Sequence, residues 1–221
     1  MTLTKPNTLI PFFLAAALIS LQAPAYAAAE HATPAPAAAS SAQTDAALRD
    51  LWVGHVFWVR NVVIETLAHN PSAASAAEKE VVANARQIAA SIEPFYGKPA
   101  SDKLFELLAG HYGAVKQYLE ATIAGSKAKQ DAATKALTDN AAEVARFLSG
   151  ANPNLTFDAV NGLLLAHGGH HIQQIQELTA KHYTDEAKTW GAMKHHMYVI
   201  ADALTGAISA QFPDKFVAQA K

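Results

Sequence analysis

The chain has 221 residues, a formal net charge of −2 and no cysteine. Without cysteine it has no disulfide bonds, no thiolate metal ligands and no lipid-anchored cysteine, so packing alone must stabilise the fold. A charge this close to neutral gives no basic surface for nucleic acid, and we expect no nucleic-acid partner.

The first 27 residues have the pattern of a secretory signal peptide. Lys5 precedes the apolar run "LIPFFLAAALISL", and Ala25–Ala27 ("AYA") has the small-x-small pattern of a cleavage site. The run is short for a spanning helix, and a retained N-terminal anchor is the alternative. We therefore expect a periplasmic or secreted protein that begins near Ala28 and has no transmembrane segment in its mature form.

Residues 28–43 contain mainly Ala, Pro and Ser and almost no bulky apolar side chains. Such a segment buries too little surface to offset the entropy of ordering, which predicts a disordered linker. The folded domain is then expected to span residues 44–221, enough for one domain with its own core.

Apolar residues follow helical spacing through the rest of the chain, without an alternating strand pattern. Turn signals separate six segments, so the sequence predicts an all-α helical bundle of about six helices, built as three tandem helical hairpins. Asp102, Thr156 and Thr184 lie near expected helix starts, where short polar side chains can cap, and Pro213 ends the last helix. The predicted helices lie near residues 44–68, 73–93, 100–124, 127–149, 155–181 and 185–211.

Three histidines suggest an internal repeat. His55, His111 and His167 lie 56 positions apart (111 − 55 and 167 − 111), within "LRDLWVGHVFWV", "LFELLAGHYGAV" and "VNGLLLAHGGHH". The second helices of the hairpins keep the same offset, because Asn84, Asn140 and His196 correspond. Ala/Leu-rich helices can also align by chance when the offset is a multiple of seven. We favour a repeat because a small residue, a histidine and an asparagine also fall in register.

Each of these histidines interrupts an apolar stripe, since residues three and four apart share a helix face. The stripes are Leu51, His55, Trp58 and Val62; Leu104, Leu107, His111, Val115 and Tyr118; and Leu164, His167, His171, Gln174 and Leu178. Glycines flank the histidines, and absent side chains there would leave room for close helix packing or a bound group. These glycines are Gly54, Gly110, Gly113, Gly168 and Gly169.

The histidines are candidate metal ligands, because neutral imidazole is the commonest side-chain ligand. His167 and His171 have the i, i+4 spacing that grips one ion. We predict a main site of His111, His167 and His171, with His55 as a fourth ligand or a hydrogen-bonding neighbour. A buried hydrogen-bonded network of histidines is the alternative.

Three residues of the last helix are further candidate ligands: His195, His196 and Asp202, with His195 and Asp202 two turns apart on one face. Nitrogen ligands without sulfur suit a divalent transition metal, namely zinc, copper, nickel or iron. Met193 and Met197 can offer thioether to copper(I), but are more simply a core stripe.

Several segments resemble a family of small uncharacterised bacterial helical proteins: "LRDLWVGHVFWVRNVV", "PFYG", "NAAEVARFL" with the following "NP", and "QFPDKF". The likeness covers nearly the whole mature chain. Members often carry the automatic names glycosyltransferase or acetylglutamate kinase, which imply parallel-strand folds that this sequence does not predict. The resemblance implies no established activity. It implies that the family pattern includes His55, Arg60, His111, Asn140, His167 and Asp202, and that His170, His171, His195 and His196 are particular to this chain.

The segment "AHGGHHIQQI" is similar to the H-x3-H segment of DinB-like helical bundles. Those bundles place three histidines around a divalent metal and include thiol-dependent transferases. This resemblance implies His111 as the third ligand beside His167 and His171.

The sequence therefore predicts an exported bundle that binds, buffers or senses a transition metal. One alternative is a DinB-like metal-dependent hydrolase or transferase, and another is a structural or interaction bundle with a buried polar network. Catalysis needs an open coordination position beside an acid or base such as Asp202 or Glu65, whereas a closed cluster favours binding or structure.

Overall fold

The structure, a computed structural model, describes residues 40–216. The predicted signal peptide (1–27) and residues 28–39 of the predicted linker lie outside this range, as do residues 217–221. Between residues 40 and 216 every regular element is a helix, as the apolar spacing predicts. None of the helices in this range is long and apolar enough to cross a membrane.

The six predicted helices are confirmed, and the turn "EPFYGKP" contains one additional short helix, α3. The elements are α1 (Ser41–Leu67), α2 (Pro71–Ser91), α3 (Glu93–Tyr96), α4 (Lys98–Ile123), α5 (Lys127–Ala151), α6 (Phe157–Thr179), α7 (Tyr183–Gln211) and the 3-10 turn η1 (Pro213–Lys215).

Helix α1 begins three residues earlier than the sequence predicts. The Ser40 hydroxyl accepts a hydrogen bond from the Gln43 N–H at 3.2 Å, and the Gln43 side chain accepts one from the Ser40 N–H at 2.9 Å. This capping box satisfies two N–H groups that the first turn otherwise leaves free. Residues 41–43 therefore belong to the helical domain and not to the linker.

The other predicted helix ends agree in part with the structure. Thr156 caps α6, accepting a hydrogen bond from Ala159 N–H at 3.3 Å, and α7 ends at Gln211, just before Pro213. Asp102 and Thr184 are not caps, because α4 and α7 begin before them. Gly97 precedes α4 with φ +80°, and this left-handed conformation makes the sharp turn that glycine allows.

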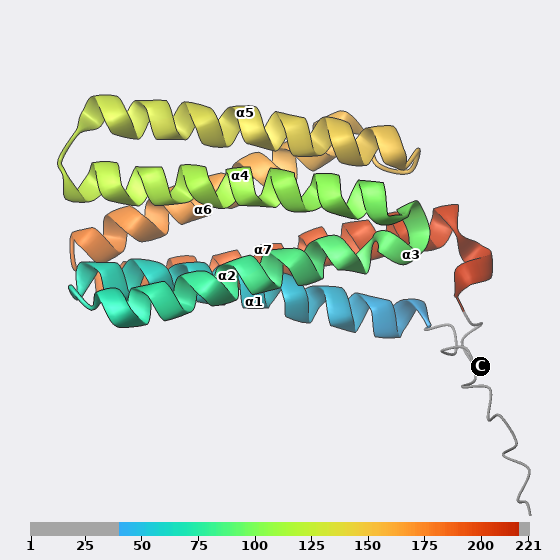
Figure 1. The fold of residues 1–221 in the computed structure, drawn as a ribbon, viewed down its shortest axis with the longest axis horizontal. Coiled ribbons are helices and arrows are strands. Elements are labelled where there is room, and N and C mark those ends of the chain that lie inside the picture. Colours follow the sequence, from blue (N-terminus) through green and yellow to red (C-terminus); the bar gives the residue numbers. More distant parts are fainter. Residues whose placement is uncertain (1–39, 217–221) are drawn as a thin grey trace, which may run out of the picture. The chain divides into compact units, whose positions relative to one another are not determined.

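The three hairpins α1/α2, α4/α5 and α6/α7 contact one another in a closed ring. The second helix of each hairpin contacts the first helix of the next: α2 contacts α4, α5 contacts α6, and α7 contacts α1. Helix α6 also contacts α4 and α1. Helices α1, α4 and α6 run in the same direction (Figure 1). Equivalent positions on these three helices can therefore meet in the interior at one level.

A similar hydrogen bond joins the two helices of every hairpin. Asn84 Nδ2 donates to Leu51 O at 2.9 Å, and Asn140 Nδ2 donates to Leu107 O at 3.0 Å. In the third hairpin the donor is a histidine, since His196 Nε2 lies 2.8 Å from Leu163 O. Each pair is separated by 33 residues. These bonds set the same register between the two helices of each hairpin.

Two of the flanking glycines make room for these cross-helix bonds. A Cβ at Gly54 would lie 3.1 Å from Asn84 Nδ2, and one at Gly110 would lie 3.3 Å from Asn140 Nδ2. A Cβ at Gly113, Gly168 or Gly169 would meet nothing within 4 Å. Close packing therefore explains the first two glycines, and the structure gives no packing reason for the other three.

Replacing Gly54 and Gly113 separately with alanine tests this difference. The Gly113→Ala variant should gain up to about 1 kcal/mol of unfolding free energy, because alanine favours a helix interior over glycine. The Gly54→Ala variant should lose about 1 kcal/mol instead, because the new methyl displaces an amide held by a hydrogen bond. Urea denaturation measures both, and equal gains in the two variants would contradict the packing role of Gly54.

Candidate metal centre

The histidines interrupt the core at one level of the bundle. One apolar cluster contains Leu104 and Leu108 of α4, and a second contains Val115 and Leu119 of the same helix. His111 lies between them in sequence. Along α1 the change occurs between Val56 of the first cluster and Val59 of the second, within one turn after His55. The apolar stripes of helices that run in the same direction pack against one another. The histidines that interrupt these stripes therefore meet inside the protein.

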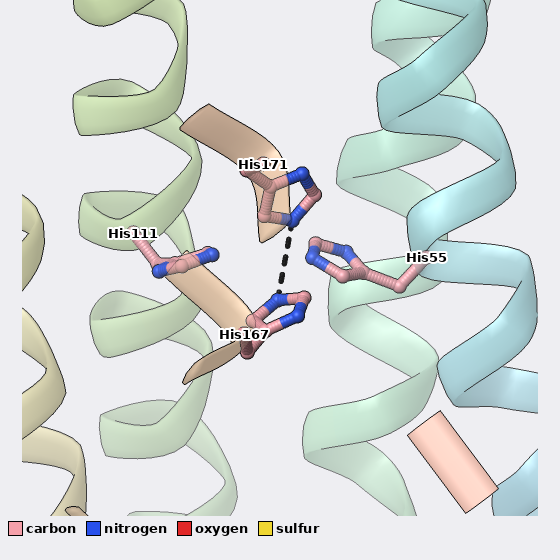
Figure 2. A group of neighbouring side chains, drawn as sticks. All are labelled: His55, His111, His167 and His171. Atoms are coloured by element: carbon pink, nitrogen blue, oxygen red, sulfur yellow. Dashed lines mark hydrogen bonds between the residues drawn. The ribbon is translucent and has the colours of Figure 1, made fainter. Parts of the chain in front are cut away.

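Four imidazoles meet there: His55 from α1, His111 from α4, and His167 and His171 from α6 (Figure 2). Each offers one ligand nitrogen, and these nitrogens all lie within 4.8 Å of one another. His167 Nε2 and His171 Nε2 are 3.2 Å apart. The predicted ligands His111, His167 and His171 are therefore together, and His55 joins them as the fourth member.

These distances suit a single ion. Four nitrogens at 2.0–2.1 Å from a tetrahedral zinc lie about 3.3 Å from each other. The pair within α6 is already at 3.2 Å. The ring centroids of His55 and His111 are 6.1 Å apart, and those of His111 and His167 are 5.1 Å apart. The ligand nitrogens, all within 4.8 Å of one another, exceed the separation in a tetrahedral site by at most about 1.5 Å.

Burial keeps all four imidazoles neutral at physiological pH. The exposed fractions are 2% for His55, 8% for His111 and 1% each for His167 and His171. Burial lowers the pKa of His111 to about 4, and burial together with the nearby His111 lowers the pKa of His55 to about 3. Burial and the neighbouring histidines also hold the pKa of His167 and that of His171 well below the usual value. Neutral imidazole has a free lone pair, which is the form that binds metal.

Several nitrogens of the cluster lack hydrogen-bond partners. Both ring nitrogens of His55, Nε2 of His111 and Nδ1 of His167 are buried with no partner among the described residues. Each such buried polar atom costs roughly 1–3 kcal/mol of folding free energy. His196, in contrast, hydrogen-bonds the Leu163 carbonyl. The cluster therefore differs from His196 in keeping buried nitrogens without a hydrogen-bond partner among the described residues.

The other candidate ligands lie outside the cluster. His195 is exposed. Asp202 forms a two-pronged ion pair with Arg49, at 2.6 and 2.7 Å. His196 lies beside His170, with ring centroids 5.5 Å apart. The structure thus brings together four of the seven predicted ligands, and His195, His196 and Asp202 have other neighbours.

Two buried methionines and one partly buried ion pair lie elsewhere in the bundle. Met193 and Met197 are fully buried in an apolar cluster, as expected for a core stripe. Arg60 pairs with Glu186 at 2.6 and 2.8 Å, and Gln174 Nε2 donates to the same carboxylate at 2.9 Å. Glu186 is only 3% exposed, so the carboxylate of this ion pair is buried. No local pattern marks Glu186, because its partner lies 126 residues away.

Comparisons with protein-family models, with curated proteins and with solved structures give no match to this chain. The resemblances to the bacterial helical family and to the DinB-like bundles therefore stay predictions.

The neutral imidazoles predict how the stability of the metal-free protein depends on pH. An unfolded histidine has a pKa of about 6.5, and burial lowers the folded-state values. Below pH 6.5 the unfolded state binds more protons, so the unfolding free energy should fall by about 1.4 kcal/mol per pH unit for each imidazole that stays neutral. Above pH 7 this contribution should be constant.

Urea denaturation between pH 5 and 8, with a chelator present, measures this dependence. A His195→Ala variant serves as the control, because that side chain is exposed and its removal should leave the pH dependence in place. A flat profile between pH 5 and 7 would contradict the burial of neutral histidines.

Proposed function

We propose that this protein is an exported helical bundle that binds one divalent transition-metal ion through His55, His111, His167 and His171. The observation that carries the proposal is the convergence of four buried, neutral imidazoles within 4.8 Å of one another, several of them with nitrogens that have no other partner. Export rests on the predicted signal peptide. The set of nitrogen ligands suits zinc, copper, nickel or iron.

The hairpins that supply the four histidines indicate how a bound ion would affect the stability of the protein. Each of the three hairpins supplies at least one ligand, because His55 is on α1, His111 on α4, and His167 and His171 on α6. An ion bound to all four would link hairpins that otherwise contact one another through side-chain packing and hydrogen bonds. Binding would therefore add directly to the unfolding free energy.

Burial of the site supports binding over catalysis on an organic substrate. All four histidines are at least nine-tenths buried, and the cavity beside them has a volume of only about 10 Å³, the space of about one water molecule. The carboxylates considered as catalytic partners lie elsewhere: Asp202 pairs with Arg49, and Glu65 accepts a hydrogen bond from Asn70. These contacts favour a metal-binding, buffering or sensing role over a DinB-like transferase or hydrolase.

Alanine substitution of His171 tests the ligand set. The His171→Ala variant should bind zinc or copper at least tenfold more weakly, because it loses one ligand of four. The neighbouring substitution His170→Ala should leave metal affinity unchanged, since His170 is outside the cluster. Competition titration with a chromophoric chelator measures the affinity, and circular dichroism checks folding. Parental affinity in His171→Ala would remove this residue from the site and favour the buried-network alternative.

Metal should also stabilise the fold in a concentration-dependent way. At a free ion concentration of about 100 times Kd, the unfolding free energy should rise by about 2.7 kcal/mol. A tenfold weaker variant such as His55→Ala should gain about 1.4 kcal/mol less at the same ion concentration. Thermal or urea unfolding with and without metal measures both gains. A metal-independent stability in the parent protein would contradict the proposed function.

A further inference from the structure

The histidine cluster has a small internal cavity on one side. The cavity has a volume of about 10 Å³ and reaches three of the four ligands, namely His55, His111 and His167. This is about the space that one water molecule occupies. The cavity volume matches a ligand with one non-hydrogen atom.

The cavity lies on the side of the cluster away from His171. It is closed by Trp52, Leu108 and Leu164, each three residues before a histidine of its own helix. His171 lies four residues after His167, one turn further in the opposite direction along α6. Three histidines thus form a layer, with the fourth imidazole on one side and the cavity on the other. An ion in this layer would have one coordination direction that points into the cavity.

Two unpartnered polar groups line the cavity opposite the histidines. Trp52 is 5% exposed, and its indole N–H has no acceptor among the described residues. Asn140 also lines the cavity, and its Oδ1 is buried without a donor. Its Nδ2 is held by the Leu107 carbonyl, so the amide is fixed with the oxygen free. One donor and one acceptor are the partners that a single oxygen atom bearing hydrogen needs.

The charge of the proposed metal site also favours a single oxygen atom bearing hydrogen as the ligand. The cluster contains histidine alone and no carboxylate, and an imidazole that binds a metal is a neutral ligand. A divalent ion would therefore keep its whole charge in a buried site, which is costly in free energy. A polar or anionic fifth ligand reduces this cost, whereas an apolar molecule does not.

We propose that the ion bound by the four histidines carries a fifth ligand, a single water-derived oxygen atom, which occupies this cavity between Trp52 and Asn140. The oxygen accepts a hydrogen bond from Trp52 Nε1 and donates one to Asn140 Oδ1. This inference rests on the proposed metal binding. It adds a second binding site, selective for ligands of one non-hydrogen atom, that the four histidines alone do not imply.

Cobalt(II) and fluoride test the proposal on the full mature chain. Cobalt(II) reports its coordination number through the intensity of its visible bands, which are weaker for five ligands than for four. Fluoride matches the size of the proposed oxygen ligand and accepts hydrogen bonds. We expect one bound cobalt ion with five-coordinate bands that shift when fluoride is added. Azide, with three atoms, should leave the bands unchanged.

The Trp52→Phe variant tests the indole donor. It keeps all four histidines, and in its cobalt complex fluoride should bind about tenfold more weakly than in the parent because its hydrogen-bond donor is lost. Trp58→Phe is the matched control: the same substitution on the same helix, at a residue that does not line the cavity. It should keep the fluoride affinity of the parent.

The possible outcomes distinguish a failure of the proposed metal binding from a failure of the proposed fifth ligand. If the parent binds no cobalt(II), zinc(II) or copper(II), the proposed function fails and the fifth ligand fails with it. If the parent binds cobalt with intense four-coordinate bands that fluoride does not change, the metal site stands and the fifth ligand is wrong. Equal fluoride affinity in Trp52→Phe and the parent would also overturn the placement beside Trp52. If Trp52→Phe does not fold, the spectra of the parent alone decide between these results.

Discussion

Four imidazoles buried at one point of an apolar core are the constraint on which the rest of the structure depends. Each loses its hydration on folding, and at least three of them keep nitrogens without a hydrogen-bond partner among the described residues. The protein tolerates this cost only if something supplies partners for the nitrogens. An ion bound as proposed would pair with one nitrogen of each of the four imidazoles, whose neutral form has the lone pair that binds metal.

The four histidines form a cluster only if the first helices of the three hairpins hold them at the same height along the bundle. If one first helix moved by a single turn, its histidine would move about 5.4 Å along the bundle and leave the cluster. The hydrogen bonds from Asn84, Asn140 and His196 to carbonyls of the partner helices hold each hairpin in a fixed register. Gly54 and Gly110 keep space for the two asparagines. Residues outside the four-histidine cluster thus fix the positions of the histidines.

The three hairpins are alike but not identical, and the differences occur at the site. The positions four residues after His55 and His111 are Val59 and Val115, both core residues, whereas the equivalent position on α6 is His171. The position three residues before the histidine is Trp52 in the first hairpin, where the other two have leucine. One hairpin thus contributes the fourth imidazole, and another contributes the only tryptophan among the side chains that line the cavity.

The sequence by itself determined the all-α class, the six long helices and the shared helix face of His167 and His171, because helical periodicity and i, i+4 spacing are local properties. It also identified His55 through its offset from the other histidines. Only the tertiary structure decided that Asp202 pairs with Arg49, that His196 bonds a carbonyl and that Glu186 is buried against Arg60. These partners are 33 to 153 residues apart in the chain. A helix face that looks suitable for metal in sequence can meet another partner first, because helix packing, and not local spacing, decides which side chains become neighbours.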